Sequence, residues 1–125
     1  MFGDFKIIKD LFHLYQVQIY LADNNRENLI LRSSDGYAGS RLLETGHQLP
    51  IDDQSLNGMA AYTKQAVIVA NTQESSQFLP HPLLPDTRSE MVVPLMVDED
   101  VLGVIDLQST EVDFLTEDVL PAFNV

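Results

Sequence analysis

The sequence predicts an α+β fold built on an antiparallel sheet, and three patterns support that class. Two apolar runs, Met91–Val97 and Val101–Leu107, are joined by acidic residues and predict a hairpin of strands covered on both faces. Strict alternation over residues 16–21 predicts a half-buried strand of a second hairpin. Helical spacing of apolar residues near both ends predicts terminal helices.

The first elements along the chain are a short helix and a hairpin. Large apolar residues at helical spacing predict an amphipathic helix over residues 4–13. The pattern then changes to alternation, which predicts a strand with a wetter face formed by Gln16, Gln18 and Tyr20. An Asp-Asn-Asn turn follows, so residues 15–34 predict a β-hairpin.

The middle of the chain contains one well-marked helix. Residues 35–47 have a less regular pattern, within which Arg41–Thr45 predicts a single helical turn. Gln48–Ile51 predicts a short extended piece. Ser55 predicts the start of a helix over Leu56–Thr63, because a serine hydroxyl can accept a hydrogen bond from the first helical turn.

The second half alternates strands with irregular segments. The β-branched run Ala66–Ala70 predicts a buried strand. Prolines at 80, 82 and 85 then stiffen a loop that leads into the strand from Met91. Thr116 predicts the cap of a final helix, in which Pro121 removes a backbone hydrogen bond. Because that helix is cut short, we expect residues 1–125 to be a single domain excised from a longer protein.

Composition narrows the classes of function. Seven Lys and Arg against nineteen Asp and Glu give a formal net charge of −12, which disfavours nucleic acid and anionic lipid as partners. The longest apolar run is far shorter than the ~20 residues of a membrane span. There is no cysteine, hence no disulfide, thiolate metal site or thiol nucleophile. The N-terminus does not resemble a secretory signal, so we expect a cytoplasmic protein.

Five stretches together form a recognisable set: YQVQIYLAD (15–23), RLLETGHQLPI (41–51), FLPHPLLPDTRSEMVVPL (78–95), VLGVIDLQS (101–109) and FLTEDV (114–119). This set resembles the GAF domain, a relative of the PAS sensory fold, in bacterial multidomain signalling proteins of the sensor histidine kinase type. The most specific part is TRSE with the apolar-Pro-apolar strand, followed by GVIDLQS. The resemblance covers nearly the whole chain.

The resemblance implies an architecture and a place for a ligand. It implies an antiparallel sheet with the terminal helices on one face, and with loops and short helices on the other. Those loops often form a roof over a pocket for a small molecule. We expect the roof to consist of residues 37–47 and 78–90, with the loop prolines holding its shape.

Eight residues are candidates for ligand binding: Tyr37, His47, Phe78, His81, Arg88, Glu90, Met91 and Asp106. If the strand has begun at Arg88, then Arg88 and Glu90 project to one face, where they would bind an anionic group and a ligand N–H respectively. The alternative is that both simply tie the loop to a neighbouring element. Asp106 interrupts an apolar strand and faces either the pocket or the helix layer.

We expect the domain itself not to be an enzyme. GAF relatives that reduce free methionine sulfoxide use cysteine, and a covalent bilin also needs cysteine, so neither is expected here. No serine lies in a nucleophile-elbow motif, and the motif of cyclic-nucleotide-binding relatives is absent. His47 and His81 are interpreted as loop residues, with haem or metal ligation as the alternative, and we expect neither group.

Two functions of different classes follow from these observations. The first is a sensory module that binds an unidentified small molecule and relays its state to a linked effector such as a histidine kinase. The second is a ligand-free dimerisation or spacer module, whose terminal helices pair through Phe2, Phe5, Phe12 and Phe123. The first requires a cavity of ~300 Å³ or more, which we expect beside Met91 and Val93. In either case we expect a homodimer.

Overall fold

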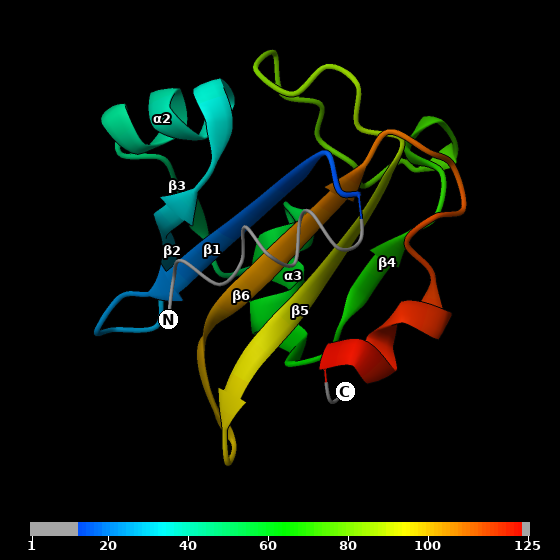
Figure 1. Cartoon of the computed structure of the whole chain (residues 1–125). Coiled ribbons are helices and arrows are strands. Elements are labelled where there is room, and N and C mark those ends of the chain that lie inside the picture. The colour runs from blue at the N-terminus through cyan, green and yellow to red at the C-terminus, as the bar shows by residue number, and fades with distance from the viewer. Residues whose placement is uncertain (1–12, 124–125) are drawn as a thin grey trace.

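The computed structural model describes residues 13–123, which form a single antiparallel sheet with helices against its faces (Figure 1). The sheet has six strands in the order β3-β2-β1-β6-β5-β4. The strands are β1 (Gln16–Ala22), β2 (Asn28–Ser34), β3 (Gln48–Pro50), β4 (Val67–Val69), β5 (Ser89–Val97) and β6 (Asp100–Ser109). The helices are α2 (Gly36–Glu44), α3 (Leu56–Thr63) and two 3-10 helices, η2 (Thr72–Glu74) and η3 (Glu117–Phe123). The predicted α+β class is therefore confirmed.

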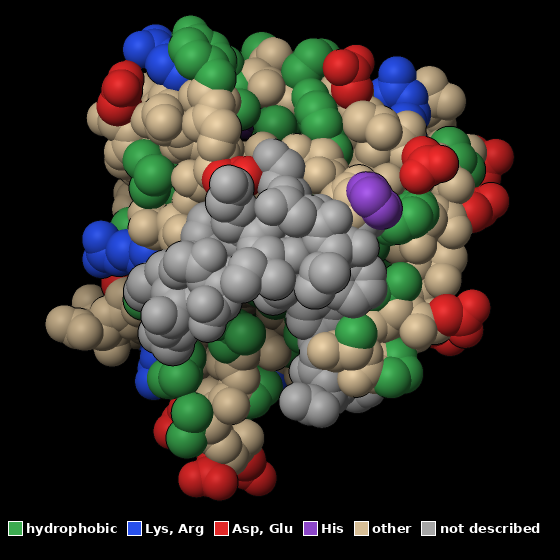
Figure 2. Space-filling model, viewed as in Figure 1, with side chains coloured by type: hydrophobic (Ala, Val, Ile, Leu, Met, Phe, Trp, Pro, Cys, Tyr) green, Lys and Arg blue, Asp and Glu red, His purple; other side chains and the backbone are tan. Residues whose placement is uncertain are grey.

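The two predicted hairpins and the central helix are confirmed. β1 and β2 form the first hairpin, and β5 and β6 form the second. The acidic residues Asp98, Glu99 and Asp100 lie exposed at the tip of the second hairpin, where Figure 2 shows the carboxylates gathered. Helix α3 spans Leu56–Thr63 as predicted, and the Ser55 hydroxyl accepts a hydrogen bond of 2.9 Å from the Gly58 N–H.

Helix α2 is longer than the predicted single turn and spans nine residues. Two of its first four residues are glycines, which have low helix propensity, so the sequence pattern was weak there. Packing stabilises the helix instead. Gly39 lies so close to Ser34 that a Cβ atom at this position would be 2.6 Å from the Ser34 carbonyl carbon, and Leu42 enters the core.

Two other expectations need correction. β4 is a half-buried edge strand rather than a buried one, because it pairs only with β5 among the described strands. The final helix is a 3-10 helix with Pro121 inside it, and the Val119 N–H donates to the carbonyl three residues earlier, at Thr116. A proline cannot donate the bond that an α-helix requires at this point. The helix predicted over 4–13 lies largely outside the described residues.

The two faces of the sheet carry separate apolar clusters. On one face, Tyr20 and Val92 belong to the cluster that includes α3 and Leu42 of α2. On the other, Met91 and Ile105 belong to the cluster against which Val119 and Leu120 of η3 pack. Figure 1 shows η3 and α3 on opposite sides of the sheet, which is the predicted arrangement for the C-terminal segment.

The face of β1 that we expected to be wetter is buried. Gln16, Gln18 and Tyr20 are each at most 3% exposed, because their side chains point to the α3 side of the sheet. The alternation was identified correctly, but it separates an apolar face from a buried polar one.

Within residues 13–123, no helix combines the length and the apolar character needed to span a membrane.

Candidate functional site

A cavity of about 280 Å³ lies on the α3 side of the sheet. This volume falls slightly short of the ~300 Å³ that we expected a ligand site to require, so the cavity would hold only a compact ligand. β1, β5 and β6 supply its floor, α3 one wall, and the segment 78–84 its roof. The lining residues are Gln18, Tyr20, Leu42, His47, Leu49, Ser55, Leu56, Asn57, Phe78, Leu79, Pro80, His81, Leu84, Thr87, Glu90, Asp106 and Gln108.

The floor of the cavity consists of polar side chains from the three central strands. Strand register places Gln16, Gln108 and Glu90 in one row across β1, β6 and β5. The next row contains Gln18 and Asp106. All five side chains are buried, and all except Gln16 line the cavity. The inner face of the sheet thus changes from apolar to polar along these strands.

A chain of hydrogen bonds holds Asp106 in place. The Thr87 hydroxyl donates to Gln108 Oε1 at 2.6 Å, and Gln108 Nε2 lies 3.4 Å from both carboxylate oxygens of Asp106. From the opposite side, Asn57 Nδ2 donates to Asp106 Oδ2 at 3.1 Å. Asn57 belongs to α3 and is 49 residues away in sequence, so the cap at Ser55 also serves to position a donor over the floor.

Glu90 and Asp106 form a buried carboxyl pair. Burial raises the pKa of Glu90 well above its usual value, and the charge of Asp106 and the hydrogen bond to it raise this pKa further. Burial also raises the pKa of Asp106, while hydrogen bonds from Glu90, Asn57 and Gln108 act in the opposite direction. Two adjacent carboxyl groups cannot both ionise at low cost, and the hydrogen bonds to Asp106 favour its ionised form, so we infer that a single proton on the pair is held mainly by Glu90.

Two histidines lie together in the cavity lining, His81 from the roof and His47 from the position just before β3. The rings of His47 and His81 lie 5.8 Å apart, and the His47 ring lies 5.9 Å from that of Tyr20. His81 Nδ1 accepts a hydrogen bond from the Leu83 N–H, which orients its ring. Burial lowers the pKa of His47, with a further contribution from His81.

Among residues 13–123, no group of three or more potential ligand side chains is arranged to hold a metal ion.

The sequence matches the GAF domain family over residues 8–123, which is most of its length. The chain belongs to the GAF domain family. A comparison with curated proteins found no significant match for this GAF domain.

Several solved structures share the fold. One is the free methionine-R-sulfoxide reductase of Neisseria meningitidis in complex with its substrate, with a TM-score of 0.78 and 24% identity over 94% of this chain and 65% of that one. The type II enzyme of Thermoplasma acidophilum has a TM-score of 0.80 and 18% identity, over 98% and 80% of the two chains. The GAF domain of an Acinetobacter phosphoenolpyruvate-protein phosphotransferase has a TM-score of 0.76 and 21% identity, over 95% and 69%. At these identities the similarity shows the fold alone.

Five of the eight predicted site residues line the cavity of this GAF domain: His47, Phe78, His81, Glu90 and Asp106. The other three do not line it. Met91 points to the opposite face of the sheet, because it alternates with Glu90 along β5. The same alternation places Val93 there, so the cavity is not beside Met91 and Val93 as expected. Tyr37 is 76% exposed on α2.

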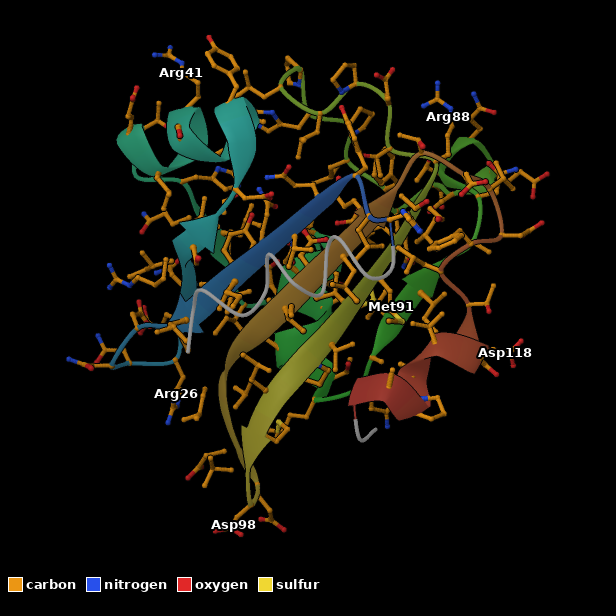
Figure 3. The ribbon with its side chains drawn as sticks, in the orientation of Figure 1. Arg26, Arg41, Arg88, Met91, Asp98 and Asp118 are labelled. Atoms are coloured by element: carbon orange, nitrogen blue, oxygen red, sulfur yellow. The ribbon has the colours of Figure 1, made fainter. Side chains whose placement is uncertain are left out.

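Arg88 also lies outside the cavity, although it is two residues from Glu90. Its guanidinium Nη1 lies 3.4 Å from the Pro85 carbonyl oxygen and 3.2 Å from that of Thr87. Figure 3 shows the side chain at the periphery, pointing away from the sheet. Arg88 precedes the first residue of β5, so the alternation of the strand does not place it with Glu90. This geometry agrees with the alternative that Arg88 ties down the loop.

Sequence reasoning missed several lining residues, above all Gln18, Asn57, Thr87 and Gln108. Gln108 carried a usable signal, because it lies two residues after Asp106 in an otherwise apolar strand and therefore shares its face. Asn57 carried no such signal. Its role depends on how α3 packs against the sheet.

We expect Arg88→Ala to lower the free energy of unfolding by about 0.5–1.5 kcal/mol, because only loop hydrogen bonds are lost. The backbone contacts of residue 88, to Ser109 and Thr72, do not depend on its side chain. Affinity for any ligand in the cavity should change less than threefold. Urea unfolding and a binding titration on the same protein check both values. A large loss of affinity with little loss of stability would instead show that Arg88 contacts the ligand.

Proposed function

We propose that this GAF domain is a non-catalytic sensory module, which binds a compact small molecule in the roofed cavity and relays occupancy to a linked effector such as a histidine kinase. The observation that carries this proposal is the buried polar floor. Glu90, Asp106 and Gln108 are each at most 6% exposed, yet they line an open volume rather than a filled core.

A polar floor of this kind is costly for a purely structural domain. Burying a carboxyl group destabilises the folded state unless hydrogen-bonding or charged partners offset its loss of hydration. Apolar side chains of similar volume at the same positions often give an equally stable or more stable fold. The remaining lining is mixed: Leu42, Leu56 and Leu84 are among its apolar residues, and Ser55 and Asn57 of the α3 wall are polar. An apolar enclosure with a few convergent polar groups is the common composition of a small-molecule site.

The relay would pass through the central strands. Along β5 and β6, the residues facing the cavity alternate with Met91, Ile105 and Leu107, which belong to the cluster on which η3 packs. A ligand that changes the position of Glu90 or Asp106 would therefore change the surface under the C-terminal segment. A ligand can shift this equilibrium only by the difference between its affinities for the two arrangements.

The absence of catalysis is part of the proposal. Two solved structures with this fold are named as free methionine-R-sulfoxide reductases. This chain has no cysteine, so any thiol-based reduction would lack its nucleophile. The dimerisation alternative stays a prediction, since Phe2, Phe5 and Phe12 lie outside the described residues.

Native mass spectrometry of freshly purified protein tests the proposal. We expect a mass difference that corresponds to a retained small molecule, and we expect Leu49→Trp to abolish it by filling the cavity. Leu102→Trp is the matched control, because Leu102 is 42% exposed on the β5–β6 hairpin. Circular dichroism would verify that both variants fold. The proposal is wrong if the wild-type protein retains no mass and no fraction of a metabolite extract raises its unfolding temperature.

A further inference from the structure

We propose that the ligand of this cavity carries a primary ammonium group on a short apolar body, and that the ammonium binds between Glu90 and Asp106. This inference rests on the proposed function, because it names the class of ligand for the same cavity. Three features of the described residues carry it: a carboxyl pair without a cation, an unpartnered acceptor beside that pair, and apolar residues in the same lining.

The carboxyl pair has no basic partner among residues 13–123. None of the lysines and arginines in this part of the chain lines the cavity. Arg41 pairs with Glu44 on the surface of α2, Lys64 donates to the Glu99 carbonyl, and Arg88 donates to its own loop. Buried charges are normally paired, so the floor lacks one positive charge.

Asn57 supplies the second, independent observation. Its side chain is 7% exposed and lines the cavity, where Nδ2 is used by Asp106. Its Oδ1 has no hydrogen-bond partner among the described residues. A buried acceptor without a partner is rare and costs about 1–3 kcal/mol, so it points to a missing donor.

The shortage at the floor is specifically a shortage of donors. Gln108 directs Nε2 toward Asp106, and Thr87 directs its hydroxyl to Gln108. Asp106 accepts hydrogen bonds but has no cationic partner among the described residues, and Asn57 Oδ1, on the residue that donates to Asp106, has no donor there. An ammonium group provides three donors and one positive charge, which matches this set. A carboxylate or phosphate would add negative charge beside Asp106, in a buried place where like charges repel strongly.

The rest of the cavity limits the body of the ligand. The apolar residues of the lining include Leu42, Leu49, Leu56, Phe78 and Leu84. A volume of about 280 Å³ leaves room for a short aliphatic chain, and His47 and His81 also line this volume.

Binding of an ammonium group would be coupled to proton release. In the empty domain the proton on Glu90 relieves repulsion from Asp106, and burial keeps the pKa of Glu90 high. A bound cation makes that proton unnecessary, because it stabilises the second carboxylate. Part of one proton should therefore leave the protein for each ligand bound at neutral pH.

The probes are pentylamine, 1-pentanol and pentanoate, which share one carbon chain and differ in the head group. Amide NMR spectra are recorded at pH 7 while each probe is added. We expect saturable shifts at residues 57, 90 and 106 with pentylamine, and at least tenfold weaker binding of the other two. Titration calorimetry should give a more negative binding enthalpy in Tris than in phosphate. The buffer takes up the released proton, and protonation of Tris releases more heat.

Glu90→Gln should weaken pentylamine binding at least tenfold, because one carboxylate is lost. Glu74→Gln is the matched control, since Glu74 is exposed on η2 and its loss removes the same charge outside the cavity. The comparison of the three probes on wild-type protein does not depend on either variant folding.

Equal or tighter binding of 1-pentanol or pentanoate would overturn the inference, as would binding of none of the three. So would a retained molecule that lacks an amine in the native mass spectrum. In that last case a ligand is present, so the proposed function stands while the ammonium class fails. Absence of any retained or added ligand would overturn both.

Discussion

Replacing Glu90 by Gln should make the domain more stable than the wild type at pH 8, by about 1–3 kcal/mol, and change its stability little at pH 4. The glutamine keeps the shape of Glu90, stays neutral at every pH, and can donate an N–H to Asp106 as the protonated acid does. It therefore retains the hydrogen bond that stabilises Asp106 and removes the group that resists ionisation.

The sign of this pH-dependent stability difference follows from the direction of the pKa shift of Glu90. Burial and the neighbouring Asp106 raise the pKa of Glu90 above its value in the unfolded chain. The folded state thus holds a proton that the unfolded state has already lost, and stability falls as the pH rises through the window between the two values. The contribution of Glu90 to the free energy of unfolding is therefore fully present below the pKa of the unfolded chain, and it is lost as the pH rises through the pKa of the folded state.

Urea unfolding of both proteins at intervals from pH 4 to pH 8 measures this effect. The wild type should lose stability relative to Glu90→Gln across that range. The exposed substitution Glu74→Gln should follow the wild-type curve, because Glu74 is not buried. Parallel curves for wild type and Glu90→Gln would mean that Glu90 ionises in the folded state as easily as in the unfolded one.

Gly58→Ala should lower the free energy of unfolding by about 3 kcal/mol. A Cβ atom at this position would lie 2.3 Å from the Pro50 carbonyl oxygen and 3.0 Å from that of Asp52. Both contacts are with backbone, so α3 itself must move away from β3. Asn57 precedes Gly58 on α3, and its hydrogen bond to Asp106 should weaken with that movement.

Gly46→Ala is the control for loss of glycine as such. Gly46 has a φ of +65°, and no atom lies within 4 Å of the place that a Cβ would take, so alanine costs backbone strain of about 1 kcal/mol without a clash. Urea unfolding compares the two variants, and the NMR signals of residues 57 and 106 report on the cavity. If Gly58→Ala were no more harmful than Gly46→Ala, α3 would not be held against β3 as described.

Much of the fold was predictable because its signals are local. The β5–β6 hairpin is marked by two apolar runs around an acidic turn, and α3 by the Ser55 cap, and neither depends on distant contacts. Asp106 was identified for a similar local reason, since it interrupts an apolar strand, whereas Glu90 was identified by its spacing of two residues from Arg88. The length of α2 was not predictable, because its glycines oppose a helix that packing against Ser34 stabilises.

By itself, then, the sequence determined the two hairpins, the central helix and which residues within a strand share a face. Only the tertiary structure decided what covers each face: Gln18 lies under a roof instead of water, Met91 packs away from the cavity, and Asn57 meets Asp106 across 49 residues. The physical reason is that periodicity is a property of one segment, whereas burial and hydrogen bonding at the floor are properties of the layers that meet there.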